Sequence, residues 1–139
     1  MLYFDDFFFF FKVTEELGSD ELIRRLKSLA HTFQVLQQAD DSNSYMDFTP
    51  LALHLSDDFF LNHASRDVQL LVACCIADIL RIFAPEAPYK DPAQIKLIFY
   101  FLIKQLGGLK DPKDTAFKRY FYLLENLAYV KSFNMCLDL

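Results

Sequence analysis

Apolar residues recur every three or four positions along most of the chain from Gly18 onward. The most regular stretch begins at Val68 and ends at Phe83. Its apolar positions have the spacing of one helix face: Val68, Leu71, Val72, Cys75, Ile76, Ile79, Leu80 and Phe83. Leu70, Ala73, Cys74 and Ala77 widen this face, so the pattern predicts a central helix that other helices cover on more than one side.

Weaker helical patterns lie on both sides of this stretch. A first helix should start at Gly18-Ser19 and carry a stripe of Leu22, Leu26, Leu29, Phe33 and Leu36. A second helix should run over 50–61. A fourth should begin at the N-cap Asp91 and end at Gly107-Gly108. A fifth should span 115–131, with one face made by Phe117, Tyr120, Phe121, Leu124, Leu127 and Ala128. Because no stretch alternates with period two over a useful length, the predicted fold class is all-α.

The order of these helices favours a HEAT-repeat-like α-solenoid fragment made of antiparallel helix pairs. The pair over 50–83 resembles a HEAT repeat, since a Pro-Leu start and a polar turn precede Asp67-Val68, Ala73 and Ala77. We therefore expect residues 14–139 to form N-terminal HEAT-like repeats. The apolar end Met135–Leu139 suggests repeats truncated at the C-terminus of this fragment.

Residues 1–13 form a separate, Phe-rich segment of unknown role. It carries Asp5 and Asp6 ahead of a Phe run and lacks the basic start and cleavage site of a signal peptide. The run ends at Lys12, well short of the ~20 apolar residues that a membrane span needs. Three interpretations are a segment packed on the first helix, an artificial or misassigned extension, and a hydrophobic anchor for a partner or membrane.

The amino-acid composition and the net charge of the chain exclude several classes of protein. The chain is 53% hydrophobic, which excludes an intrinsically disordered protein. Its 14 basic against 19 acidic residues give a net charge of −5, so we expect no autonomous binding to nucleic acid. The 3 glycines form no Gly-rich phosphate loop, which argues against a nucleotide-binding enzyme.

No catalytic or metal-binding set is visible in the sequence. Cys74 and Cys75 fall within the central helix and are expected in the core, Cys136 is unplaced, and three cysteines suggest a reducing compartment. The histidines lie apart on different predicted elements, and the adjacent carboxylates Asp57-Asp58 and Asp40-Asp41 diverge. We therefore predict a protein that is not an enzyme and has no cofactor or metal.

The segment FAPEAPYKDP (83–92) is the most unusual connection between helices. Pro85 and Pro88 restrict the backbone, so the loop should be stiff. It follows the negative end of the central helix dipole and adds Glu86 beside Tyr89. This combination suits a cation next to an aromatic group. The alternative is that the prolines only end one helix and start the next.

Three motifs, LLVACCIADILR, APEAPY and RYFYLLENLA, carry a family resemblance. From about Thr14 to Leu139 the chain resembles the N-terminal region of the Pds ("precocious dissociation of sisters") family of cohesin regulators. The Phe-rich start departs from the family. The resemblance implies a long HEAT-repeat scaffold of the nucleus, associated with chromatin. It also implies a role in sister chromatid cohesion, through the loading, release and acetylation of the cohesin ring.

The resemblance also implies a peptide-docking site. In this family the APEAPY motif binds Tyr-Ser-Arg segments of the releasing factor Wapl and of sororin or its insect counterpart Dalmatian, and haspin kinase is a further ligand. On this chain the motif comprises Ala84, Pro85, Glu86, Ala87, Pro88 and Tyr89. Helix adjacency adds the hypothesis that Asp58, Phe59 and Glu125 complete the pocket. We expect Glu86 and Tyr89 to be exposed together, and replacement of Tyr89 to leave the fold intact. A generic α-solenoid scaffold without a peptide site in this fragment is the alternative.

Overall fold

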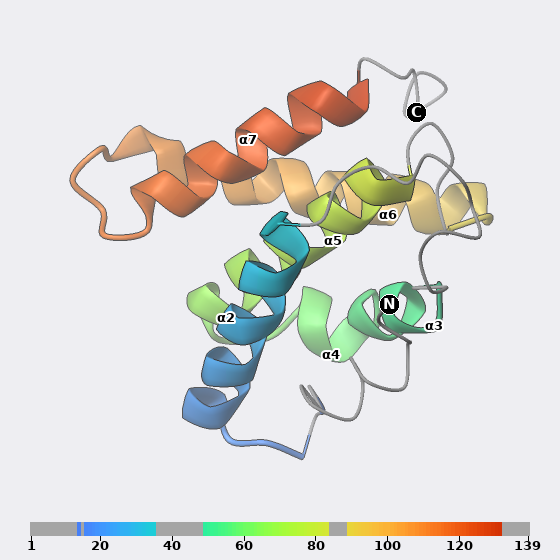
Figure 1. Ribbon diagram of the computed structural model, residues 1–139, viewed down its shortest axis with the longest axis horizontal. Coiled ribbons are helices and arrows are strands. Elements are labelled where there is room, and N and C mark those ends of the chain that lie inside the picture. The colour runs from blue at the N-terminus through green and yellow to red at the C-terminus, as the bar shows by residue number, and fades with distance from the viewer. Residues whose placement is uncertain (1–13, 15, 36–48, 84–88, 132–139) are drawn as a thin grey trace.

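The computed structural model describes residues 14, 16–35, 49–83 and 89–131. In these ranges every regular element is a helix (Figure 1), in the order α2 (Ser19–Val35), α3 (Thr49–Leu55), α4 (Asp58–Leu61), α5 (Arg66–Phe83), α6 (Pro92–Gln105), the 3-10 helix η1 (Leu106–Lys110) and α7 (Phe117–Lys131). The predicted all-α, HEAT-repeat-like solenoid class is confirmed. Figure 1 shows α6 and α7 running in opposite directions, and α7 packs mainly on α5 and η1.

Several sequence predictions lie outside the described residues. They concern the Phe-rich segment 1–13, Leu36 of the first helix, the carboxylates Asp40-Asp41, the loop residues 84–88, and the end 132–139 with Cys136. The boundary between residues 13 and 14 stays a prediction.

Helix α5 is the centre of the fold. Every residue from Leu70 to Leu80 is buried, and α5 contacts α2, α3, α4, α6 and α7. The residues expected to be buried have no exposed surface: Val68, Val72, Cys75, Ile76 and Ile79. Ser65 caps the start of this helix, because its hydroxyl oxygen accepts a hydrogen bond from the Val68 N–H at 3.4 Å.

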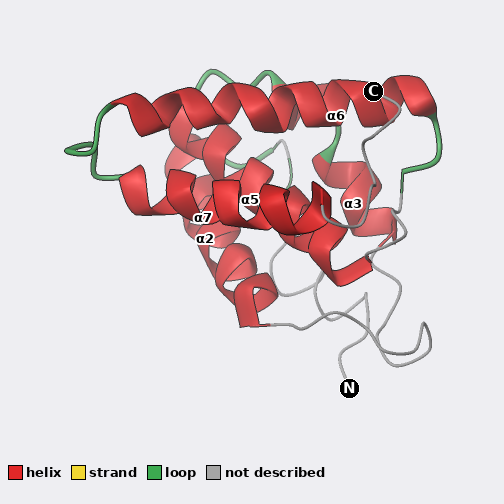
Figure 2. Cartoon of the chain, turned by 90° about the horizontal axis from the view of Figure 1, so that it is seen from above, coloured by secondary structure: helices red, strands yellow, loops and turns green. Residues whose placement is uncertain are grey.

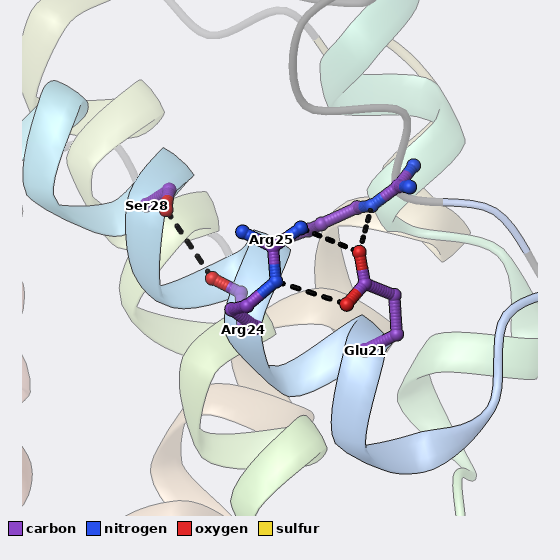
Figure 3. Close-up of polar contacts among 4 residues, drawn as sticks. All are labelled: Glu21, Arg24, Arg25 and Ser28. Atoms are coloured by element: carbon purple, nitrogen blue, oxygen red, sulfur yellow. Dashed lines mark hydrogen bonds and ion pairs between the residues drawn. The ribbon is translucent and has the colours of Figure 1, made fainter.

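Helix α2 matches the predicted first helix and places Leu22, Leu26, Leu29 and Phe33 in the core. Its exposed side carries the ion pairs of Glu21 with two arginines (Figure 3). The Arg24 Nε donates to Glu21 Oε2 at 2.9 Å, and the Arg25 Nε donates to Glu21 Oε1 at 2.8 Å. These contacts lower the pKa of Glu21 from 4.5 to about 2, first through the hydrogen bond from Arg24.

The single helix predicted over 50–61 is wrong, because the chain breaks between α3 and α4. Asp57 has an extended backbone, and its carboxylate accepts a hydrogen bond from the Phe59 N–H at 3.0 Å. That is the geometry of an N-cap, so Asp57 starts a new short helix. The break buries Phe60 and Leu61 and leaves Asp57 exposed.

The predicted stop at Gly107-Gly108 also needs correction. Helix α6 ends at Gln105, but the chain continues through both glycines as η1. A Cβ on Gly108 would overlap the ring carbons of Tyr120, whereas a Cβ on Gly107 would meet nothing within 4 Å. Gly108 therefore allows η1 to approach α7 closely, which only a residue without a side chain permits.

Helix α7 buries a face that overlaps only in part with the one predicted, since Tyr120 is buried as expected and Leu127 packs against the core. Tyr120, Leu123 and Asn126 are buried, while Phe121 and Leu124 of the predicted face remain 48% and 38% exposed. The buried face includes Asn126 because α5 offers it a polar partner in the core. The face predicted from apolar spacing is therefore displaced around the helix from the face that is buried, and the two share Tyr120.

Candidate functional site

The proposed peptide loop lies between two described helices. Helix α5 ends at Phe83, and the description resumes at Tyr89, just before α6. Ala84, Pro85, Glu86, Ala87 and Pro88 lie outside the described residues. The residues on its two sides, Phe83 at the end of α5 and Tyr89 ahead of α6, belong to the described part of the chain.

Tyr89 is buried in the core. Its ring is 2% exposed, and its hydroxyl donates a hydrogen bond to the Ala52 carbonyl oxygen in α3 at 3.0 Å. Burial raises the pKa of the Tyr89 hydroxyl. The expectation of an exposed Tyr89 is therefore wrong, since the side chain fills the space between α3 and the start of α6. That its replacement leaves the fold intact stays a prediction.

A second contact fixes the start of α6 to α3. The Gln94 side-chain amide donates to the Ser56 hydroxyl oxygen at 3.1 Å. Asp91 caps α6 as predicted, because its carboxylate accepts from the Ala93 N–H at 3.0 Å and Pro92 occupies the first turn. The chain that leaves the loop is thus held by an aromatic anchor, a side-chain hydrogen bond and a helix cap.

The other three predicted site residues do not come together. Asp58 is exposed on α4, where its carboxylate accepts a hydrogen bond from the Asn62 amide. Phe59 is half-buried and makes edge-to-face contacts with Phe60 and His63 at 5.0 and 5.1 Å between ring centroids. Glu125 is exposed on α7, which lies apart from α4 in Figure 1. No hydrogen bond or ring contact among the described residues joins Glu125 to the α4 pair.

A buried polar cluster around Asp78 was not predicted. Asp78 lies within α5 and has no exposed surface. Its Oδ1 accepts hydrogen bonds from the Tyr122 hydroxyl at 2.6 Å, the Asn126 amide at 3.0 Å and the Arg81 guanidinium at 3.2 Å. Burial raises the pKa of Asp78, and the donors act against that shift. The signal in the sequence is one carboxylate inside the most apolar helix, where carboxylates are rare unless paired.

A cavity of about 180 Å³ adjoins this cluster, lined by Ala30, Gln34, Cys74, Asp78, Lys118, Arg119 and Tyr122. Arg81 also donates to the Phe33 carbonyl oxygen at 3.0 Å, so the polar cluster connects α2, α5 and α7. Desolvation raises the pKa of the Cys74 thiol to about 12, so this sulfur stays protonated. The cluster holds α2, α5 and α7 together.

The histidines of the described ranges lie in three different environments. The His63 Nδ1 accepts a hydrogen bond from the Ser65 N–H at 3.0 Å, just before α5. His54 packs edge-on against Phe60 at 5.1 Å, and His31 is exposed on α2. Within these ranges no group of three His, Cys, Asp or Glu side chains is arranged to hold a metal ion. The described helices also include none that is long and apolar enough to span a membrane.

Comparisons with known proteins place these elements in a family. A family model described as "Sister chromatid cohesion protein PDS5 protein" matches residues 20–139. The PDS5 homolog A-B of Xenopus laevis and the PDS5 homolog A of Homo sapiens are each 52% identical over 128 residues, which is 92% of this chain. The match spans about a tenth (10%) of the length of either relative.

A solved structure has the same helix arrangement. The structure of the Pds5–Scc1 complex superimposes with a TM-score of 0.70 and 31% sequence identity, covering 86% of this chain and 17% of the matched one. Sequence and structure therefore agree, and the chain belongs to the PDS5 family of sister chromatid cohesion proteins.

Proposed function

We propose that this chain is a non-enzymatic, cohesin-associated module of sister chromatid cohesion that docks short Tyr-Ser-Arg segments through residues 84–89. The family and the names of its relatives support the cohesion role, and the likeness to Pds5 in its complex with Scc1 supports association with cohesin. A protein with this role would act on chromatin in the nucleus. The residues on either side of the loop support the docking step.

The observation that carries the docking step is the anchoring of Tyr89. The chain enters the 84–88 segment from the rigid helix α5 and leaves it at a buried aromatic ring whose hydroxyl is hydrogen-bonded to Ala52. Fixed ends reduce the entropy that a binding segment loses when it engages a ligand. In this proposal Tyr89 positions the loop from inside the core, and the ligand contacts residues 84–88.

Glu86 supplies the charge for the ligand. It follows the last residue of α5 by three positions, near the negative end of the helix dipole. A charge-assisted hydrogen bond from an arginine guanidinium to its carboxylate is worth roughly 1.5 to 3 kcal/mol. In this proposal Asp58 and Phe59 extend the site on the α3–α4 side, and the support is that α4 directly follows the helix that Tyr89 contacts. Glu125 is a separate candidate on α7.

The proposed ligands are the Tyr-Ser-Arg segments of Wapl and of a sororin-type protector such as Dalmatian, with haspin kinase as a further partner. If these ligands share one loop, they compete for it. The competing proposal is a scaffold in which residues 84–88 only connect α5 to α6.

Titration of a fluorescently labelled Tyr-Ser-Arg peptide, followed by anisotropy, separates the two proposals. Glu86→Lys should weaken binding by ~10-fold or more, since ~1.4 kcal/mol corresponds to a factor of 10. Glu16→Lys is the matched control: it makes the same charge reversal at an exposed residue ahead of α2. A Tyr-Ser-Ala peptide tests the arginine directly.

Circular dichroism confirms that each variant keeps its helices. Equal affinity of wild type, Glu86→Lys and Glu16→Lys, or equal affinity for the two peptides, would leave the loop as a connector. Loss of binding in Glu125→Lys but not in Glu86→Lys would move the site to α7.

A further inference from the structure

Helix α6 has an apolar outer face in addition to its buried one. Its inner face packs on the core through Ile98, Phe99, Phe101, Leu102 and Gln105. The outer face of such a helix is normally polar. Here Leu97, Tyr100 and Ile103 are 56%, 69% and 60% exposed, and Figure 2 shows α6 along one edge of the molecule.

Two lysines border these apolar side chains. Lys96 and Lys104 are both exposed, and each is four positions from Tyr100, while Leu97 and Ile103 are each three positions from it. Residues three and four apart are neighbours on a helix surface. We call these five residues, Lys96, Leu97, Tyr100, Ile103 and Lys104, the α6 surface. Tyr100 lies at its centre, and the two lysines mark its ends, with their Cα atoms about 12 Å apart along the axis.

The charge of this region is opposite to that of the whole protein. Residues 90–110 contain four lysines and one acidic residue, Asp91, whose carboxylate caps α6. The full chain has a net charge of −5. A local positive patch with an exposed tyrosine and two aliphatic residues is unusual on such a protein, and aromatic side chains of this kind often carry most of the binding energy of an interface.

We propose that the α6 surface binds an acidic amphipathic helix of a partner protein. The apolar side of such a helix would cover Leu97, Tyr100 and Ile103, while its flanking carboxylates would meet Lys96 and Lys104. This is the helix-on-surface mode of recognition, with anchors three and four residues apart. The opposite charges would speed the encounter and exclude basic partners.

Charge also distinguishes this occupant from the alternatives. A second copy paired through its own α6 would bring lysines against lysines, which is repulsive in either direction of the helices. Nucleic acid and anionic membranes would meet two surface lysines on a protein of net negative charge, which provides little electrostatic attraction. The proposal is independent of peptide docking at residues 84–89, because it uses different residues and a ligand of opposite charge.

The test uses the 139-residue chain and two synthetic helical peptides. Both carry Leu and Phe at positions i, i+3, i+4 and i+7. One has Glu at the flanking positions, and the other has Lys there. Fluorescence anisotropy should show saturable binding of the Glu peptide, at least ~10-fold tighter than that of the Lys peptide, and weakening as salt is raised.

Three variants decide which residues carry this binding. Tyr100→Ser should weaken the Glu peptide by ~10-fold or more, as expected for a central aromatic anchor. The double variant Lys96→Glu, Lys104→Glu should reverse the preference, so that the Lys peptide binds more tightly. Lys27→Glu changes an exposed lysine on α2 and should leave both affinities as in wild type.

Several outcomes would overturn the proposal. These are equal binding of the two peptides, an unchanged preference in the double lysine variant, and equal effects of Lys27→Glu and Tyr100→Ser. Self-association in sedimentation runs that Tyr100→Ser abolishes would instead assign the surface to a second copy. Binding of the wild type to phosphatidylserine vesicles that Tyr100→Ser abolishes would assign it to a membrane.

Discussion

The Tyr89 hydroxyl donates a hydrogen bond to the Ala52 carbonyl oxygen, across 37 residues of sequence. The same carbonyl oxygen also accepts the Ser56 N–H at 3.2 Å, so it keeps a partner if the hydroxyl is removed. Tyr89 thus joins the end of a proline-rich connection to α3. Two helices, α4 and α5, separate α3 from Tyr89 in the chain.

This contact predicts a graded response to substitution. Tyr89→Phe removes one buried hydrogen bond and should lower the free energy of unfolding by about 0.5 to 1.5 kcal/mol. Tyr89→Ala also leaves a cavity and should lower it by about 3 to 5 kcal/mol. Urea denaturation followed by circular dichroism measures both values.

Tyr100→Phe is the matched control, because Tyr100 is 69% exposed on the next helix. Its free energy of unfolding should stay within about 0.5 kcal/mol of wild type. If Tyr89→Phe and Tyr100→Phe proved equally stable, the hydroxyl would not act as an anchor.

Local sequence signals predicted most of the helix boundaries correctly. Ser65 and Asp91 start α5 and α6 because their side chains satisfy N–H groups of the first turn, a requirement visible in sequence. The regular spacing from Val68 to Ile79 similarly identified the buried helix. The break at Asp57 was missed because two aspartates within an apolar run also suit an exposed helix face.

The errors at Tyr89 and on α7 share one physical cause, which is contact between distant parts of the chain. Tyr89 was assigned to a ligand surface because its partner, Ala52, cannot be inferred from spacing. The buried face of α7 was misassigned because Asn126 enters the core to reach Asp78, 48 residues away. Of the candidate site, the sequence identified the motif and the cap that follows it, and tertiary packing determined which side chains remain at the surface.

The Asp78 cluster predicts strong coupling between α5 and α7. The Tyr122 hydroxyl donates to the buried carboxylate at 2.6 Å, so Tyr122→Phe should lower the free energy of unfolding by roughly 1.5 to 3 kcal/mol, the range for bonds to charged groups. In an Asp78→Asn background the same substitution should have a smaller effect, because the acceptor is no longer charged. A double-mutant cycle in urea measures the difference. Equal effects in the two backgrounds would contradict the proposed pairing.

Glu21 predicts a defined acid sensitivity of α2. The hydrogen bonds from Arg24 and Arg25 lower its pKa in the folded state from 4.5 to about 2. A lowered folded-state pKa gives a stabilising contribution that is present above pH 4.5 and is lost as the pH falls toward 2. Glu21→Gln should therefore be less stable than wild type at pH 7 and approach it near pH 2.

Thermal unfolding over this pH range tests the prediction, with Asp20→Asn as the control from the same helical turn. Asp20→Asn should not reproduce the convergence with wild type at low pH. A constant difference between wild type and Glu21→Gln at every pH would show that the ion pairs are not the cause. Because these side chains are on the surface, high salt should reduce the difference at pH 7.

The two adjacent glycines of η1 predict opposite responses to one added methyl group. A Cβ on Gly108 would collide with the Tyr120 ring, and that ring belongs to a residue that is 2% exposed and cannot move into solvent without opening the core. Gly108→Ala should therefore lower the free energy of unfolding by about 1 to 3 kcal/mol, as overpacking does. Gly107→Ala should be neutral or stabilising by up to ~1 kcal/mol, because nothing lies within 4 Å of the new atom and the unfolded chain loses freedom. In a Tyr120→Leu background, where the side chain is shorter, Gly108→Ala should cost less. Equal stabilities of Gly107→Ala and Gly108→Ala in urea denaturation would mean that η1 does not need its close approach to α7.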